Sequence, residues 1–461
     1  MNSYIFFAVV ALTILTNIVW AWLKRKGMTF SIYAADPNRY NSFIIAVSVA
    51  GTIVGGGMFL AVGQIGYEAG TVGFILGFIY LVGLTIVGGI TKAVRGLMDE
   101  GNHDSLLDLL GSTYGNRATW QFCFICLWMY VFLLAGQFVA LVLFARYVQD
   151  LTGVAWLPWS LVALAVISIF VYPIIGGLRK DIRTDIVQVS IVFIATGIIL
   201  WRILSNGVIG SMWAGLPPSH LLGTGYGAVF VIGAILFLTP SFLVRMDIWQ
   251  RIRAARSDTA SKRAFWIAGI VSCFFYLFFT TVGIWAYTLR LPGGRYSTLE
   301  LINQQFRSPV ILAVVFGAFF AAVLSSADTF VNNASLFVTR IAVPRLWSRK
   351  QEQSADRALL NWSRGFAFVL IGVALLVGVV IPNIVDLLVG AFSLLLIYLP
   401  TILGLFLPRW RSNRAAFWSP ASGAVLFAAL FFAWNPKIAF APAVILSIVT
   451  YGLIRATEKA T

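Results

Sequence analysis

The sequence predicts an all-α membrane protein that crosses the bilayer many times. Hydrophobic residues make up 60% of the 461 residues and charged residues only 11%, whereas a soluble domain carries about 25% charged residues. The mean hydropathy is +0.89. Apolar blocks of about 20 residues, the length that spans a bilayer as a helix, recur along the whole chain.

Taken in order, the apolar blocks predict thirteen transmembrane helices. Each block is bounded by charged residues, glycine or proline, which are typical of loops and helix ends. The expected spans are 4–23, 42–66, 71–90, 118–146, 156–176, 184–204, 226–248, 264–288, 309–342, 362–381, 384–407, 415–434 and 439–454.

The basic residues predict how these helices are oriented. If the N-terminus lies outside, 27 of the 33 lysine and arginine residues face the cytoplasm, as the positive-inside rule requires. Lys24–Lys26 follow the first apolar block, which favours a retained helix over a cleaved signal peptide. We therefore expect an integral protein of the plasma (cytoplasmic) membrane, with the C-terminus in the cytoplasm. The net charge of +16 is scattered between apolar blocks, so no nucleic-acid partner is expected.

Residues with reactive side chains do not form an enzyme site. Cys123, Cys126 and Cys273 lie in apolar helices, where cysteine is usually a packing residue. His103 and His220 lie in loops and do not form a zinc or haem motif. We therefore expect no catalytic residues and no cofactor.

Two of the expected helices contain helix-breaking residues near the middle of the membrane. The second contains AGTIVGGGMF (Ala50–Phe59) and the seventh contains FLTPSF (Phe237–Phe242). Glycine permits non-helical backbone and proline removes a hydrogen-bond donor, although close packing or a simple kink would explain either segment alone. The two helices open consecutive blocks of five, which predicts inverted repeats with a binding site at the midplane.

The ninth helix carries a polar stripe that predicts a cation site. In AAVLSSADTF, Ala322, Ser325 and Ser326 share one side of the helix, and Asp328 and Thr329 overlap with it. Hydroxyl and freed carbonyl oxygens are suitable ligands for sodium, so we expect the broken second helix to pack against this stripe. Serine and threonine also commonly bond back to their own helix.

Two carboxylates and several midplane residues complete the candidate site. A carboxylate within the membrane, such as Asp328, is functional by default. Asp185 lies one turn into the sixth helix, where an acid that faces the helix dipole is an equally good interpretation. The candidate residues for a substrate cavity, each of which is also a plausible packing residue, are Gly55, Gly56, Gln137, Thr239, Phe392 and Tyr398.

Several motifs resemble the sodium/solute symporter family. They are YPIIGGLRKDIRTDIVQ (172–188), MDIWQRIRAARSDTASKRA (246–264) and AAVLSSADTFVNNASLFVTR (321–340), with weaker matches in SLLDLLGSTYGN and LPTILGLFLPRWRSN. The resemblance extends from about residue 42 to 420. It implies a LeuT-type core of two inverted five-helix repeats, at 42–204 and 226–407. An extra N-terminal segment (1–41) and two C-terminal helices (408–461) would flank this core.

The resemblance also implies the ion sites and the activity. The first sodium site would use Gly51, Val54, Ala322, Ser325 and Ser326. A second cation or proton site would use Asp185, Ser325, Asp328 and Thr329. The expected partners are sodium, a small organic solute and the lipid bilayer, and the expected activity is sodium-coupled import by alternating access.

The chain also departs from the family pattern. Ile53 and Gly55 stand where some members carry an aspartate and a hydroxyl residue, and Asp328 and Thr329 stand where two hydroxyls are common. The extra carboxylate strengthens the second cation site or moves coupling toward protons, and the sequence leaves both alternatives open. A transporter-like membrane sensor is a third hypothesis. The polar sugar-binding residues of the sugar-carrying members are missing from the matching part of the second helix, which argues against a sugar as the substrate.

Overall fold

A computed structural model describes most of the chain. It covers residues 36–461 apart from 102, 104, 176, 292, 293, 295, 347–351, 436 and 461, together with residues 8, 11, 12, 15 and 19. The expected first helix, 4–23, therefore lies largely outside the described residues. The remaining twelve expected spans all coincide with helices.

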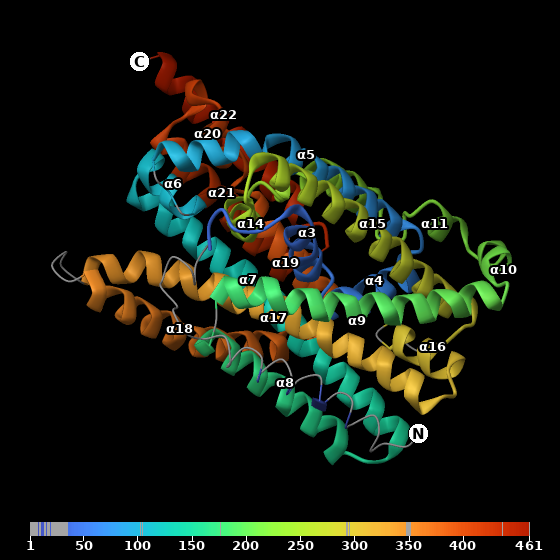
Figure 1. Cartoon of the computed structure of the whole chain (residues 1–461). Coiled ribbons are helices and arrows are strands. Elements are labelled where there is room, and N and C mark those ends of the chain that lie inside the picture. Colours follow the sequence, from blue (N-terminus) through green and yellow to red (C-terminus); the bar gives the residue numbers. More distant parts are fainter. Residues whose placement is uncertain are drawn as a thin grey trace.

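Long helices cross the molecule roughly side by side (Figure 1). The longer elements are α3 (Ser42–Ile53), α4 (Gly56–Ala69), α5 (Val72–Glu100), α7 (Asn116–Thr152), α8 (Trp156–Ile175), α9 (Gly177–Ser205), α15 (Asp258–Thr288), α17 (Pro309–Leu346), α18 (Glu352–Val380), α19 (Ile384–Leu396), α20 (Leu399–Phe406), α21 (Asn413–Ala433) and α22 (Phe440–Ala460). The shorter ones are α6 (Leu106–Tyr114), α10 (Ile209–Ala214), α11 (Pro218–Leu221), α12 (Ala228–Gly233), η1 (Ala234–Leu238), α13 (Thr239–Ser241), α14 (Met246–Ala254), α16 (Ser297–Gln305) and η2 (Pro408–Trp410).

The described helices confirm the membrane class but not the expected count of thirteen spans. Nine described helices are long and apolar enough to cross a bilayer, or eleven if each of two bent pairs is one span. A shorter apolar helix, Trp156–Val171, adds to these. The difference from thirteen comes from that short helix and from the N-terminal segment that lies outside the described residues.

The second expected helix is broken where its glycines cluster. Its two halves, α3 and α4, meet at an angle of 60°. Val54 ends α3 with a non-helical ψ of 59°, and Gly55 caps α4 in an extended conformation. A Cβ atom at Gly55 would lie 2.3 Å from the Oγ atom of Ser326. Glycine is therefore required at this position because α17 approaches the break so closely.

The seventh expected helix is interrupted just after its proline rather than at it. The π-helical turn η1 precedes Pro240, and residues 242–245 are non-helical before α14 begins. A second bend was not predicted: α19 and α20 meet at 44° within what the sequence indicates as one helix, 384–407. Pro400 explains it, because proline cannot donate the helical hydrogen bond to the carbonyl of Leu396.

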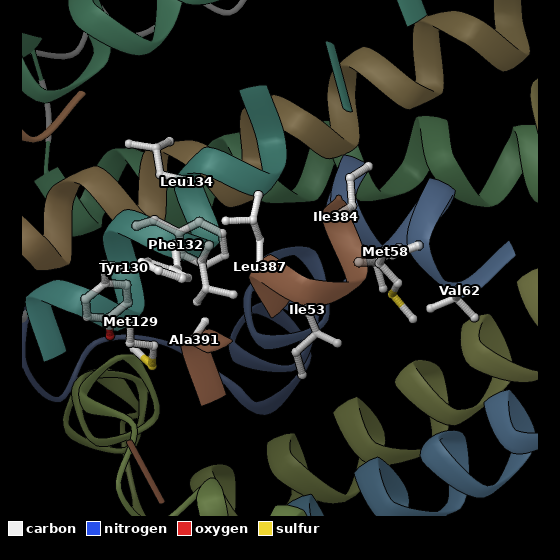
Figure 2. Packing of buried hydrophobic residues seen from close by; sticks show 14 of the residues in the cluster. Ile53, Met58, Val62, Met129, Tyr130, Phe132, Leu134, Ile384, Leu387 and Ala391 are labelled. Carbon is white, nitrogen blue, oxygen red and sulfur yellow. The ribbon is translucent and has the colours of Figure 1, made fainter. Parts of the chain in front are cut away.

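The core lies around the two longest helices, α7 and α17, which pack against each other. Within the 18-residue apolar stretch of α17, 83% of the residues are buried inside the molecule, and within the corresponding stretch of α7 the share is 78%. Figure 2 shows how residues beside the break, Ile53 and Met58, lie near Ile384 and Leu387 of α19. The break is therefore enclosed by the protein, where irregular backbone is tolerated at membrane depth.

Candidate ion and solute site

The polar stripe of α17 faces the broken helix. The Ser326 hydroxyl donates to the carbonyl oxygens of Gly51, at 3.3 Å, and Thr52, at 3.2 Å. Ala322 lies one turn earlier on α17 and is 1% exposed. The structure therefore brings α17 against the end of α3, as the sequence predicts, and places three oxygen atoms together at the break.

A second group of polar atoms surrounds Asp185 on α9. Its carboxylate accepts hydrogen bonds from the hydroxyls of Ser325, at 2.5 Å, and Ser48, at 2.7 Å. A Cβ atom at Gly51 would lie 3.3 Å from the carboxylate carbon. Helices α3, α9 and α17 therefore meet at this carboxylate, which is 1% exposed.

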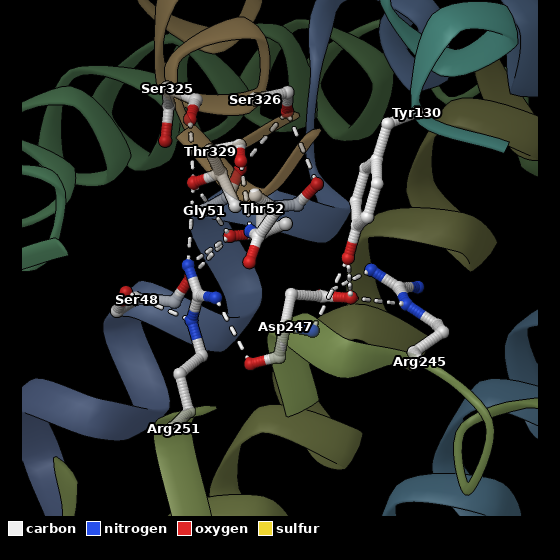
Figure 3. Close-up of polar contacts among 11 residues, drawn as sticks. Ser48, Gly51, Thr52, Tyr130, Arg245, Asp247, Arg251, Ser325, Ser326 and Thr329 are labelled. Carbon is white, nitrogen blue, oxygen red and sulfur yellow. Dashed lines mark hydrogen bonds and ion pairs between the residues drawn. The ribbon is translucent and has the colours of Figure 1, made fainter. Parts of the chain in front are cut away.

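Arg251 of α14 reaches into the same region from the predicted cytoplasmic end. Its guanidinium donates to the Thr52 hydroxyl at 2.6 Å and to the Ser48 hydroxyl at 3.2 Å. It also lies 3.4 Å from the Thr329 hydroxyl (Figure 3). The residue is fully buried. A permanent positive charge is thus held among oxygen atoms of α3 and α17.

Asp328 is paired with a lysine of α9. The Lys180 ammonium lies 2.7 Å from the Oδ2 atom of Asp328, and the two side chains are 6% and 2% exposed. The other carboxylate oxygen of Asp328 has no hydrogen-bond partner in the described part of the chain. Asp185 and Asp328 do not share one cation here, because each has separate partners.

A further buried ion pair lies at the interruption before α14. The Arg245 guanidinium bonds to both carboxylate oxygens of Asp247, at 3.1 and 2.7 Å, and Tyr130 donates to the same carboxylate at 3.2 Å (Figure 3). Asp247 is 1% exposed. Its position at a helix end suggests solvation by water, but in the structure Arg245 and Tyr130 take the place of water.

A cavity of about 110 Å³ adjoins the break. Three predicted residues line it, namely Gly55, Gln137 and Phe392, together with Ser326. The Gln137 side chain accepts a hydrogen bond from the Gly57 backbone at 3.1 Å. The other polar lining residues are Thr52, Arg245, Ser393, Tyr80 and Tyr276, and the apolar ones include Met58, Phe230, Phe330, Leu388 and Phe440.

Three residues predicted for the substrate cavity lie elsewhere. Gly56 packs against α17, where a Cβ atom would lie 2.0 Å from the Val323 side chain. The Thr239 hydroxyl bonds back to the Ile235 carbonyl at 3.0 Å. Tyr398 is fully buried and donates to the Ala118 carbonyl at 2.6 Å, at the start of α7. Counting residues from a helix end gives the depth of each residue, but it does not give the side of the helix on which it lies.

Ion pairs and backbone contacts close the predicted cytoplasmic end of the molecule. The Asp36 carboxylate accepts from Arg179, at 3.0 and 2.8 Å, and from Tyr40 at 2.6 Å. Burial opposes ionisation of Asp36, but the hydrogen bonds from Arg179 and Tyr40 outweigh it and hold its pKa below the ordinary value. Arg95 of α5 bonds to the Asn38 side chain and to two carbonyls at the end of α14.

Comparison with protein families gives a match over part of the chain. Residues 37–214, which include the broken helix and α9, match the model of the "Sodium:solute symporter family". This stretch is less than half of the chain, and over it the chain is similar to that family. The nine to eleven apolar helices among the described residues fit a protein that spans the membrane.

Among individual proteins, the chain matches a distant relative. It is 25% identical over 399 residues to high-affinity choline transporter 1 of Drosophila melanogaster, a match that covers 81% of this chain. The match spans 61% of the length of that transporter, so the activity of the whole relative does not transfer directly to this chain.

Solved structures indicate the fold of the chain. A Na⁺-coupled sialic acid symporter in a substrate-bound outward-open state has a TM-score of 0.76, with 16% identity and 98% of both chains covered. MhsT in complex with L-phenylalanine has a TM-score of 0.57, with 16% identity, and covers 90% of this chain and 99% of its own. These neighbours have the LeuT-type fold.

The sequence did not reveal every residue of the site. Lys180 and Arg251 were assigned to the cytoplasmic loops, yet both are buried among the candidate ligands. The sequence of α9 does indicate a polar face directed into the protein, because Asp181, Asp185 and Gln188 recur at spacings of four and three residues. All three are buried, and this spacing places them on one face of the helix.

Proposed function

We propose that this protein is a symporter that imports a small organic solute together with sodium, by alternating access. The family match and the fold support sodium-coupled solute transport. The observation that carries the proposal is the break at Val54 and Gly55. It faces the Ser326 hydroxyl and adjoins a buried cavity. Ion and solute sites that share one broken helix allow each to favour the same conformations, which is what coupling requires.

The first sodium site is proposed at Gly51, Val54, Ala322, Ser325 and Ser326. Two carbonyl oxygens of α3 already lie within 3.3 Å of the Ser326 hydroxyl. A hydroxyl rotates freely, so it can turn a lone pair toward an ion instead of donating to a carbonyl. These oxygen ligands are uncharged, which suits a monovalent ion in a buried site.

The cavity favours a solute with a large apolar surface. Gly55 and Gly56 are among the residues expected from the sequence, but the lining consists mainly of aromatic and aliphatic side chains. The one guanidinium in it, that of Arg245, is neutralised by Asp247. Gln137, Ser326 and Ser393 remain to orient a polar group of the solute, which is the usual pattern of small-molecule sites.

Repeats and orientation complete the proposal. The segments 42–204 and 226–407 act as inverted repeats, flanked by 1–41 and 408–461, and the N-terminus lies outside. Sodium enters from that side and leaves past Asp185 toward the cytoplasm. The closed network around Asp36 lies at the end that this orientation places inside.

Proton coupling through Asp185 is the second candidate function. One observation favours it: the Asp185 carboxylate accepts only hydroxyl hydrogens in the bonds that the described residues make to it, from Ser48 and Ser325. A carboxylate without an ion-pair partner inside the membrane commonly carries a proton relay. Uptake that continues without sodium and stops when the pH gradient is removed would select this alternative.

Replacement of Ser326 by alanine tests the sodium site. The change removes one uncharged oxygen ligand, which costs about 1–1.5 kcal/mol. We therefore expect the sodium concentration that half-stabilises the purified protein against heat to rise by about tenfold. Ser272→Ala is the matched control, because Ser272 is a buried serine of α15 without a described hydrogen-bond partner. An unchanged sodium dependence in Ser326→Ala would exclude this site.

A further inference from the structure

The predicted ligands of the second cation site are already occupied by cations of the protein itself. Lys180 places its ammonium 2.7 Å from the Asp328 carboxylate. The Arg251 guanidinium lies 3.4 Å from the Thr329 hydroxyl. Both positive charges come from side chains that are at least nine-tenths buried. The region therefore contains two positive charges of the protein itself, beside the buried carboxylates of Asp181, Asp185 and Asp328.

The two other predicted ligands are used as well. Ser325 donates its hydroxyl hydrogen to Asp185, at 2.5 Å. Asp185 takes its second hydrogen bond from Ser48, which in turn accepts from Arg251. The hydrogen-bond chain thus runs from one arginine through a serine to the aspartate, so Ser325 and Asp185 are bonded to each other and not to Asp328.

The proposed first site is different in this respect. The oxygen atoms around Ser326 are the carbonyls of Gly51 and Thr52 and its own hydroxyl. No lysine or arginine bonds to these three atoms in the described part of the chain. One cation site is therefore open to an ion, while the region around the other is filled by side chains.

We propose that Lys180 is a tethered cation that takes the place of a second coupling ion, so that the protein binds one sodium ion per chain. This inference rests on the proposed function and adds its stoichiometry. An ammonium on a lysine stem neutralises Asp328 as a sodium ion would, but it cannot dissociate during the transport cycle. Asp328 stands where a hydroxyl is common in the family pattern, and the presence of Lys180 on α9 explains how this extra carboxylate is neutralised.

The tethered cation also fits the packing of the two helices. Helix α9 packs along α17, and the ion pair joins them through side chains that are 148 positions apart in the sequence. An unpaired carboxylate at this depth is costly. Without the lysine, Asp328 therefore either takes up a proton or binds another cation, and a sodium count distinguishes the two.

Sodium counting on purified protein tests the proposal. Binding of radioactive sodium to the full chain in lipid nanodiscs is measured to saturation, with no solute present. We expect one ion per wild-type chain and two per chain of Lys180→Met, in which neither Asp328 oxygen has a described partner. The double variant Lys180→Met with Asp328→Thr removes the pair as a unit and is expected to return to one ion.

The control is Lys262→Met, which removes an exposed lysine that lies over the Trp266 ring, away from the site. It should bind one ion, as the wild type does. Two ions in the wild type would overturn the inference, and so would one ion in a folded Lys180→Met. If Lys180→Met does not fold, the wild-type count still decides between one ion and two. A wild type that binds no sodium contradicts the proposed sodium coupling itself, which distinguishes that failure from this one.

Discussion

A single methyl group at Gly55 should displace the proposed sodium ligand Ser326. The backbone of Gly55 has φ of −83° and ψ of 174°, an extended conformation that alanine adopts without strain. The cost of Gly55→Ala is therefore one of space alone. The added Cβ atom would lie 2.3 Å from the Ser326 Oγ atom and 2.8 Å from its Cβ atom.

Contacts this short force the serine or the break to move. Overpacking a buried site by one methyl group costs about 1–3 kcal/mol. If that cost falls on the arrangement that binds the ion, the sodium concentration for half-maximal stabilisation rises by between about fivefold and 150-fold. The unfolding temperature without sodium should change less than the sodium dependence, because the unliganded serine is free to shift.

Sodium-dependent thermal unfolding of purified protein is the assay, with Gly317→Ala as the matched control. Gly317 lies on the same helix as Ser326, and a Cβ atom there meets nothing within 4 Å. Alanine should therefore be neutral or stabilise α17 by up to about 1 kcal/mol. The reasoning fails if Gly55→Ala and Gly317→Ala show the same sodium dependence as the wild type.

Two further predictions concern buried charges. Asp247→Asn leaves the Arg245 guanidinium buried without its ion-pair partner and should cost about 3–5 kcal/mol of stability in thermal unfolding. The double variant with Arg245→Met should recover most of that loss, and a double variant as unstable as the single would contradict this account. For Asp36, whose pKa is lowered in the folded state, the stabilisation is present above the unfolded pKa, at about 3.9, and is lost as the pH falls through the folded value. The difference in unfolding temperature between wild type and Asp36→Asn should therefore shrink between about pH 5 and pH 2, and a difference that grows with acid would refute the assignment.

The breaks show what a single sequence can predict about this fold. Gly55, Gly56 and Gly57 stand together in an apolar helix, so the interruption of the second span was visible. The bend between α19 and α20 was missed although Pro400 signals it. A proline placed near a helix end is compatible with both a bend and a simple termination.

The candidate site was only partly predictable, because it is formed by contacts between residues that lie far apart in the sequence. The contact between Ser326 and Gly51 could be predicted, because the hydroxyls of a polar stripe and the freed carbonyls of a broken helix are both suitable ligands for one ion. The pairing of Lys180 with Asp328 could not, because a lysine near a helix end is normally interpreted as a loop residue that water solvates. Tyr398 and Thr239 were expected at the cavity from their depth, but the rotation of each helix turns them elsewhere.

The depth of Ser326 within α17 has an electrical consequence. The apolar part of α17 runs from Pro309 to Phe337, and Ser326 lies near its middle. An ion that reaches this depth crosses about half of the membrane voltage, which amounts to about 1.2 kcal/mol per 100 mV for a single charge. A resting potential of that size, negative inside, would by itself strengthen sodium binding from the outside by about sevenfold.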